Sequence, residues 1–220
     1  MHAHLSHAFQ RLKKSLFTLS GAVEENLHLA MKAVLEGESH LVDQVRARDL
    51  EIDLMEVDFE EECLKVLALH QPVAIDLRFV VSVLKINNDL ERIGDLAVSI
   101  AEHAPRFVGL DPVECARKLP LMAEKAQSML RKSLDAIVGM DGRLAREVLA
   151  ADDEVDGMYF EMTQTLRGAI RADGSRVDDL MAVMMICKHI ERIADLATNI
   201  AEDAIYMVDG EIVRHGRYDA

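Results

Sequence analysis

Apolar residues recur at intervals of three and four positions along almost the whole chain. The N-terminal segment shows the pattern most clearly, with apolar side chains at Leu5, Phe9, Leu12, Leu16, Leu19, Val23, Leu27, Met31 and Val34. Because an α-helix turns once every 3.6 residues, this spacing places the apolar side chains on one helical face. No segment shows the strict alternation that is typical of a half-buried strand. The pattern therefore predicts an all-α protein.

Five short segments rich in Gly, Pro or polar residues interrupt the helical pattern. They cover residues 36–39, 71–72, 105–112, 139–142 and 172–175. Gly and Pro are unfavourable inside a helix and common between helices, so each segment is expected to end one helix and begin the next. The breaks predict six helices, three in each half of the chain.

The third predicted helix of each half carries nearly the same sequence. The segment ERIGDLAVSIAEHA at Glu91–Ala104 returns as ERIADLATNIAEDA at Glu191–Ala204, with ten of fourteen positions identical. Unrelated segments of ordinary composition would share about one position. We interpret the repeat as a tandem duplication and expect two three-helix bundles of nearly antiparallel helices that dock together. The predicted domains are residues 1–109 and 110–212, followed by a tail at 213–220.

The chain is strongly acidic, and this narrows the choice of partners. Half of its 220 residues are apolar, and its net charge of −14 disfavours nucleic acid and anionic lipid while favouring cations or basic protein surfaces. Three scattered cysteines, Cys63, Cys115 and Cys187, form no CxxC pair, which favours a reducing compartment. No apolar run has the length of a membrane span, and the first residues lack a secretory hydrophobic region. We expect a cytoplasmic protein that binds no nucleic acid.

Carboxylates form stripes along single faces of the second and third helix of each half. They lie at Asp49, Asp53, Glu56, Glu60, Glu91, Asp95 and Glu102 in the first half and at Asp152, Asp156, Glu191, Asp195 and Glu202 in the second. Like charges four residues apart destabilise a helix by roughly 0.2–0.5 kcal/mol per pair. A partner that offsets this repulsion is therefore expected.

Counting from the first predicted turn places two acidic pairs at the same height. Asp49 and Asp53 lie 22 and 18 residues before Gln71. Glu91 and Asp95 lie 20 and 24 residues after it. In the second hairpin the corresponding pairs agree to within about one helical turn of 5.4 Å. Each bundle is therefore expected to gather four carboxylates about 30 Å from its turn, at a rise of 1.5 Å per residue.

Four carboxylates in one patch repel one another, raise some pKa values or recruit cations. One interpretation is a pair of solvated faces neutralised by basic residues such as Arg92 and Arg192. The other is metal binding, which we favour because the same arrangement occurs twice at matching depth. A ligand set made only of oxygen atoms suits Mg²⁺, Ca²⁺, Mn²⁺ or ferric iron.

At these residues the chain resembles a known family. The segments MEVDFEEECLKVLALHQPVAIDLRFVVSVLKINNDLERIGDLAVSIAE and CKHIERIADLATNIAE are similar to the PhoU family, the accessory proteins of bacterial phosphate-specific transport. The resemblance implies two PhoU domains in a cytoplasmic protein that forms a homodimer and is a negative regulator of the phosphate-starvation response. In that role it would link the phosphate ABC transporter ATPase to a phosphate-sensor histidine kinase.

The resemblance also implies a metal site in each half, since some family members bind multinuclear iron or zinc clusters through paired E/D-x-x-x-D motifs. Carried onto this chain, the implied ligands are Asp49, Asp53, Glu91 and Asp95, then Asp152, Asp156, Glu191 and Asp195. The second half has ADGSRVDDL where the first has the motif Q-P-x-x-x-D-L-R. The two turns are therefore not expected to be equivalent.

An enzymatic function is not supported by the motifs. A ferritin-like di-iron oxidase uses Glu-x-x-His, but Gly94 and Ala194 stand where the histidines would be needed. The chain also lacks a P-loop and a nucleophile elbow. We expect no catalysis. The alternative to the phosphate regulator is a helical scaffold, or a metal-binding or storage protein without a role in phosphate control.

Overall fold

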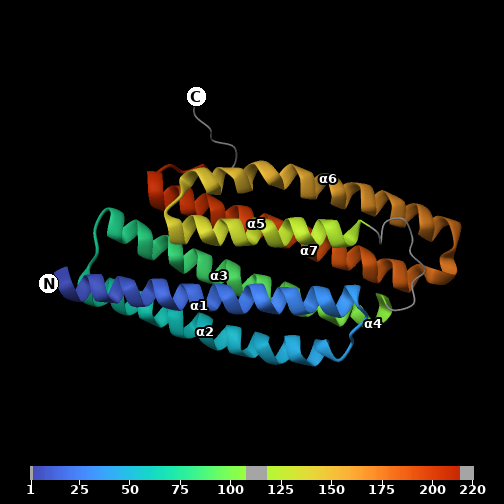
Figure 1. The fold of residues 1–220 in the computed structure, drawn as a ribbon, viewed down its shortest axis with the longest axis horizontal. Coiled ribbons are helices and arrows are strands. Elements are labelled where there is room, and N and C mark those ends of the chain that lie inside the picture. The colour runs from blue at the N-terminus through green and yellow to red at the C-terminus, as the bar shows by residue number, and fades with distance from the viewer. Residues whose placement is uncertain (1, 108–117, 214–220) are drawn as a thin grey trace.

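The computed structural model describes residues 2–107 and 118–213, and within these ranges the protein consists of helices joined by short turns, with no strand (Figure 1). The long helices in these ranges are α1 His2–Leu35, α2 Leu41–His70, α3 Ile75–Glu102, α5 Leu119–Gly139, α6 Gly142–Ala172 and α7 Val177–Asp209. Two short elements, the helix α4 Ala104–Phe107 and the 3₁₀ turn η2 Gly174–Arg176, stand between them. The predicted all-α fold with six long helices is confirmed. None of the described helices is both long and apolar enough to cross a bilayer.

One predicted break begins differently from the expectation. Pro105 lies inside α4, in the first turn of the helix, where the backbone N–H that proline lacks would have no partner. Residues 108–112 of this break lie outside the described residues. The predicted boundary between residues 109 and 110 and Cys115 also lie outside the described residues. The same is true of residues 214–220, which form most of the predicted tail.

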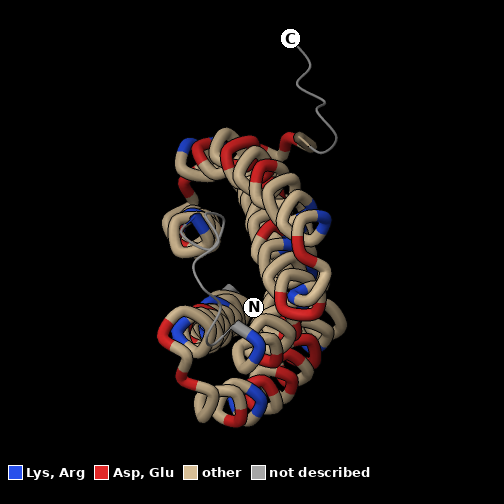
Figure 2. The backbone as a smooth tube through the Cα atoms, turned by 90° about the vertical axis from the view of Figure 1, so that its right-hand side faces the viewer, with Lys and Arg blue, Asp and Glu red and all other residues tan. Residues whose placement is uncertain are grey.

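The long helices form two three-helix bundles that lie side by side. The first bundle consists of α1, α2 and α3, and the second of α5, α6 and α7; they meet where α3 packs against α7 and α1 against α5 (Figures 1 and 2). The apolar stripes turn inward, so that Ile52, Phe59, Leu90 and Leu166 are fully buried. Burying a side chain of this size stabilises the fold by roughly 1.5–3 kcal/mol. The core runs from one bundle into the other.

The turns between the helices set the register of each hairpin. Gln71 ends α2 in a left-handed conformation with φ 46°, and its N–H donates to the carbonyl of Leu67 at 3.2 Å. Pro72 follows, which favours an end to the helix at this point. In the second bundle the turn is instead η2, preceded by Asp173, whose carboxylate accepts from the N–H of Ser175 at 2.9 Å. The two turns therefore differ, as the sequences predicted.

The two helices that carry the repeated sequence run antiparallel to each other. Lys85 in the first half of α3 places its Nζ 3.3 Å from Oδ1 of Asp203 near the end of α7. His103, just after α3, stacks on His189 in the first half of α7, with ring centroids 6.2 Å apart. This antiparallel contact brings corresponding stretches of the two repeats together around an approximate two-fold axis.

Candidate metal centre

The first carboxylate cluster lies between α2 and α3. Asp49 and Asp53 occupy successive turns of α2, and Glu91 and Asp95 occupy successive turns of α3. The pKa of Asp49 is raised to about 6, first by burial and then by the charges of the other three carboxylates. Burial, followed by Asp95 and Asp53, also raises the pKa of Glu91. The four predicted residues therefore lie close enough to repel one another.

Asp49 extends deepest into this first cluster. Its Oδ1 is shielded from water and has no hydrogen-bond partner among the described residues. The atom lies against the backbone of α3 at Gly94, where a Cβ would stand only 2.8 Å from it. A buried polar atom that lacks a partner costs on the order of 1–3 kcal/mol, and a charged one costs more. A cation would remove this cost.

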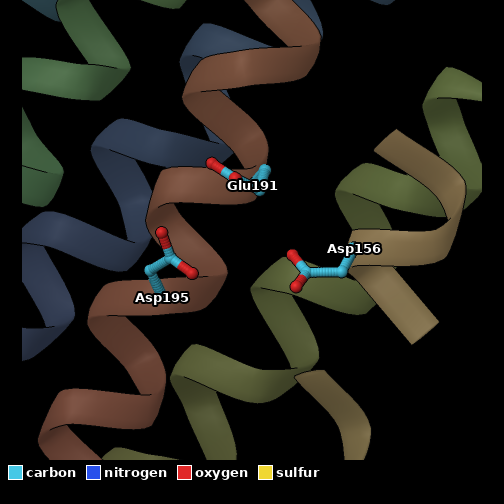
Figure 3. A group of neighbouring side chains, drawn as sticks. All are labelled: Asp156, Glu191 and Asp195. Atoms are coloured by element: carbon cyan, nitrogen blue, oxygen red, sulfur yellow. The ribbon is translucent and has the colours of Figure 1, made fainter. Parts of the chain in front are cut away.

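The second cluster joins α6 and α7. Asp156 on α6 and Glu191 and Asp195 on α7 each offer one oxygen, and these oxygens lie within 4.8 Å of one another (Figure 3). Asp152 lies one turn before Asp156, and burial followed by the neighbouring carboxylates raises its pKa to about 6. Its Oδ1 is also buried without a hydrogen-bond partner among the described residues. The structure thus gathers the predicted residues of the second half as well.

Basic side chains neutralise these clusters only in part. Lys188 places its Nζ 2.7 Å from both carboxylate oxygens of Glu191. Arg92 turns instead to Asp89, at 3.8 Å. Within the described part of the chain, Arg192 forms no ion pair. The two arginines that the solvated-face interpretation invoked therefore do not pair directly with the cluster carboxylates.

The two clusters border one shared cavity between α3 and α7, which has a volume of about 430 Å³. Its walls include the corresponding residues Arg92 and Arg192, Asp95 and Asp195, and Ser99 and Asn199. The sequence prediction treated the bundles separately and missed this cavity. The signal that could have found it is the near identity of α3 and α7, because duplicated helices often meet across a two-fold axis.

Other members of the acidic stripes have different surroundings, although Glu56 remains close enough to Asp53 and Glu91 for their charges to interact. Glu102 accepts hydrogen bonds from Arg46, the shorter at 2.8 Å. Glu56 and Glu60 line a larger cavity of about 770 Å³, which Glu202 of α7 also borders. Helical periodicity could not separate these residues from the clusters, because it shows which face of a helix they share and not what that face contacts.

Comparisons with known proteins follow the two bundles. A family model described as "PhoU domain" matches residues 16–104 and 119–204, one match per bundle. A Clostridium acetobutylicum protein named phosphate-specific transport system accessory protein PhoU homolog is 33% identical over 93% of this chain and 94% of its own length. A protein of the same name from Aquifex aeolicus is 35% identical over 94% of this chain and 93% of its own.

Two solved structures share the architecture. The crystal structure of PhoU from Pseudomonas aeruginosa has a TM-score of 0.90 and 32% sequence identity, and the alignment covers 94% of this chain and 99% of that one. The structure of the phosphate transport system regulatory protein PhoU from Streptococcus pneumoniae has a TM-score of 0.87 at 27% identity, covering 95% and 99%. The likeness therefore extends over both bundles.

Proposed function

This chain belongs to the PhoU family, and from that premise we propose that it is a cytoplasmic accessory protein of phosphate-specific transport. In this role it keeps the phosphate-starvation response switched off while phosphate is plentiful. The observation that carries the proposal is the match of both bundles, nearly end to end, to relatives named as accessory proteins of that transport system.

The proposed mode of action is contact with other proteins rather than catalysis. The names of the relatives describe accessory and regulatory proteins. The partners in this proposal are the ATPase of the phosphate ABC transporter and the phosphate-sensor histidine kinase, and the active form is a homodimer. A net charge of −14 would steer the protein toward basic surfaces on such partners.

The proposal includes metal at the two carboxylate clusters. Asp49, Asp53, Glu91 and Asp95 would hold it in the first bundle, and Asp152, Asp156, Glu191 and Asp195 in the second. The buried, unpartnered Oδ1 atoms of the first aspartate in each set support this fit. The oxygen donors suit Mg²⁺, Mn²⁺, Ca²⁺ or ferric iron, and carboxylates also bind zinc. When bound, the metal would neutralise the clusters and link the second helix of each bundle to the third.

A deletion strain tests the regulatory part of the proposal. Loss of the gene is expected to switch on phosphate-starvation genes even in phosphate-rich medium, and the purified protein is expected to turn over no phosphate ester or nucleotide. Complementation with the intact gene is the control. Phosphate genes that still shut off normally in the deletion strain would contradict the proposal.

Elemental analysis tests the metal part separately. Protein purified without chelator or a nickel column should carry more than one metal per chain. The midpoint of thermal unfolding should then rise with the concentration of the bound metal, because a ligand of the folded state alone stabilises it by mass action. A midpoint that is indifferent to iron, zinc, manganese and magnesium would contradict metal binding.

The acidic clusters also favour a second candidate function, metal storage without phosphate control. The deletion strain separates the two candidates. A storage protein would leave phosphate genes under normal control and lower the metal content of the cell.

A further inference from the structure

The outward face of α2 carries four large aliphatic side chains that no other part of the described chain covers. Leu50, Leu54, Val57 and Leu64 are 66%, 68%, 52% and 52% exposed. Their spacing of four, three and seven residues places them on one face of the helix, opposite buried residues such as Phe59. We call these four residues the outer stripe. It extends about 21 Å along the helix at 1.5 Å per residue.

The position of α2 keeps the outer stripe away from the rest of the molecule. α2 packs against α1 and α3 and lies along the lower edge of the protein in Figure 1, on the side away from the second bundle. Single exposed leucines are ordinary on protein surfaces, whereas an aligned row of them is typical of helices that dock with another element.

The second bundle shows that the fold does not require this stripe. On α6, Asp152 and Asp156 correspond to Asp49 and Asp53, an offset of 103 residues. The positions that correspond to the outer stripe are Asp153, Gly157, Phe160 and Arg167. Only one of the four is a large apolar residue. A bundle of the same architecture therefore forms without an aliphatic row on this face.

Carboxylates border the outer stripe on both sides. Along α2, Asp49, Asp53, Glu56 and Glu60 form the row on one side, and Glu51, Asp58 and Glu62 form the row on the other. No lysine or arginine occurs between residues 49 and 64. Within the described part of the chain, Glu51 and Asp58 make no ion pair. Glu62 pairs with Arg11 at 3.5 Å and with Lys65 at 3.7 Å, and Glu61, which lies between Val57 and Leu64 on the face of the stripe, pairs with Lys65 at 3.1 Å. The apolar row thus lies in a negative field, which Arg11 and Lys65 reduce near Leu64.

Charge decides which partner fits this surface. A second copy of the chain would bring the same acidic rows against themselves, and like charges across an interface oppose association. An anionic bilayer is repelled for the same reason. A helix with an apolar row flanked by Lys and Arg matches both the aliphatic side chains and the charge.

We propose that the outer stripe of α2 is a docking site for a basic amphipathic helix of another protein. The apolar rows of the two helices pack together, and basic residues of the partner face the acidic rows. The docking proposal specifies the chemistry of one protein partner in the proposed function. Only the biological role of this contact rests on that function. Binding is measured on the purified chain, so its failure and that of phosphate control are separate results.

The test uses the full chain and a fluorescein-labelled synthetic helix of about 21 residues, with leucines at helical spacing and flanking lysines. A peptide with glutamates in place of the lysines is the control ligand. Fluorescence anisotropy should show binding of the lysine peptide alone, weakening between about 50 mM and 300 mM salt because the charges are exposed. Circular dichroism verifies that every variant remains folded.

Variants locate the site. Leu54→Ser with Val57→Ser should weaken binding by about tenfold or more, since two central apolar contacts are lost. Val138→Ser with Phe160→Ser removes two side chains of the second bundle that are each 64% exposed, and should leave the affinity unchanged. Glu51→Gln with Asp58→Asn keeps the stripe intact and should reduce both the affinity and its salt dependence.

Three outcomes would overturn the proposal. The first is equal binding of the lysine peptide to the wild type and to the Leu54→Ser, Val57→Ser variant. The second is an equal loss of affinity in the Val138→Ser, Phe160→Ser control, which would show general attraction to an acidic protein. The third is a dimer that the Leu54→Ser, Val57→Ser variant converts to monomer in sedimentation experiments without peptide, which would make a second copy the occupant.

Discussion

The carboxylate of Asp49 on α2 lies directly against the backbone of Gly94 on α3, and a Cβ at residue 94 would stand 2.8 Å from its Oδ1. Position 94 is one of four differences between the repeated segments, and its twin is Ala194. The absence of a side chain at Gly94 lets Asp49 approach the backbone of α3 this closely, although the corresponding Asp152 also has a buried Oδ1 in the bundle that carries Ala194. This contact leads to the first prediction.

Gly94→Ala is expected to push the Asp49 carboxylate outward and to lower the metal content of the first cluster. An alanine ordinarily stabilises a helix by about 1 kcal/mol over glycine, so a gain in stability smaller than this would report the clash. Gly157→Ala on α6 is the matched control, because a Cβ there meets no atom within 4 Å. Elemental analysis and urea unfolding provide the two measurements. Full metal content in Gly94→Ala would show that the depth of Asp49 is unimportant for binding.

The second prediction concerns pH. The pKa values of Asp49 and Asp152 are raised to about 6 in the folded protein, against about 3.9 for an unfolded aspartate. The folded state therefore binds more protons between these values, and its free energy of unfolding should fall as pH rises from about 4 through about 6. Above about pH 6 this contribution to the free energy of unfolding stays at its lower value.

The measurement is urea unfolding of chelator-treated protein, compared with an Asp49→Asn, Asp152→Asn variant across the same pH range. Burial lowers the pKa of His103 and His189, so these groups make stability fall as pH decreases, the opposite sign. The contribution of the histidines cancels in the comparison, because both proteins contain them. A difference between the two proteins that stays constant with pH would contradict the prediction.

The third prediction concerns the ligands of the first cluster. Glu91→Ala with Asp95→Ala should lower metal content while leaving helicity unchanged, because Asp95 is exposed and neither side chain belongs to the apolar core. Glu102→Ala is the control, since this stripe residue binds Arg46 outside the cluster. The readouts are metal stoichiometry and circular dichroism. Unchanged stoichiometry in the double variant would remove the first site.

The fourth prediction concerns the contact between the bundles. Asp203 is 2% exposed and lies 3.3 Å from the Lys85 ammonium, so Lys85→Met should destabilise the protein by about 1 kcal/mol, because a buried carboxylate loses this cation. Methionine is the residue at the corresponding position 185, which makes the change compatible with this kind of helix. Adding Asp203→Asn should restore part of the loss in urea unfolding. A double variant no more stable than Lys85→Met would contradict the charge explanation.

The sequence predicted the helices and the level acidic pairs, because both follow from spacing along one chain. It did not predict which basic residue each acidic residue meets. Lys188 neutralises Glu191, while Arg92 turns away to Asp89. These choices depend on side-chain positions across helices, and periodicity contains no information about them. The cavity between Asp95 and Asp195 was missed for the same reason, since it exists only once the two bundles are docked.

The antiparallel contact of α3 with α7 has an evolutionary consequence. Two separate copies of a single-bundle ancestor would have had to find each other by diffusion, whereas two copies in one polypeptide meet at an effective concentration on the order of millimolar. In a symmetric dimer of one chain, every substitution appears in both subunits. In a tandem repeat, a substitution in one bundle leaves the other bundle unchanged. The corresponding positions 103 and 203 differ in this way. His103 stacks on His189, whereas Asp203 forms an ion pair with Lys85. On the duplication that the repeated segments indicate, tethering would allow one end of a symmetric interface to become ionic and the other aromatic.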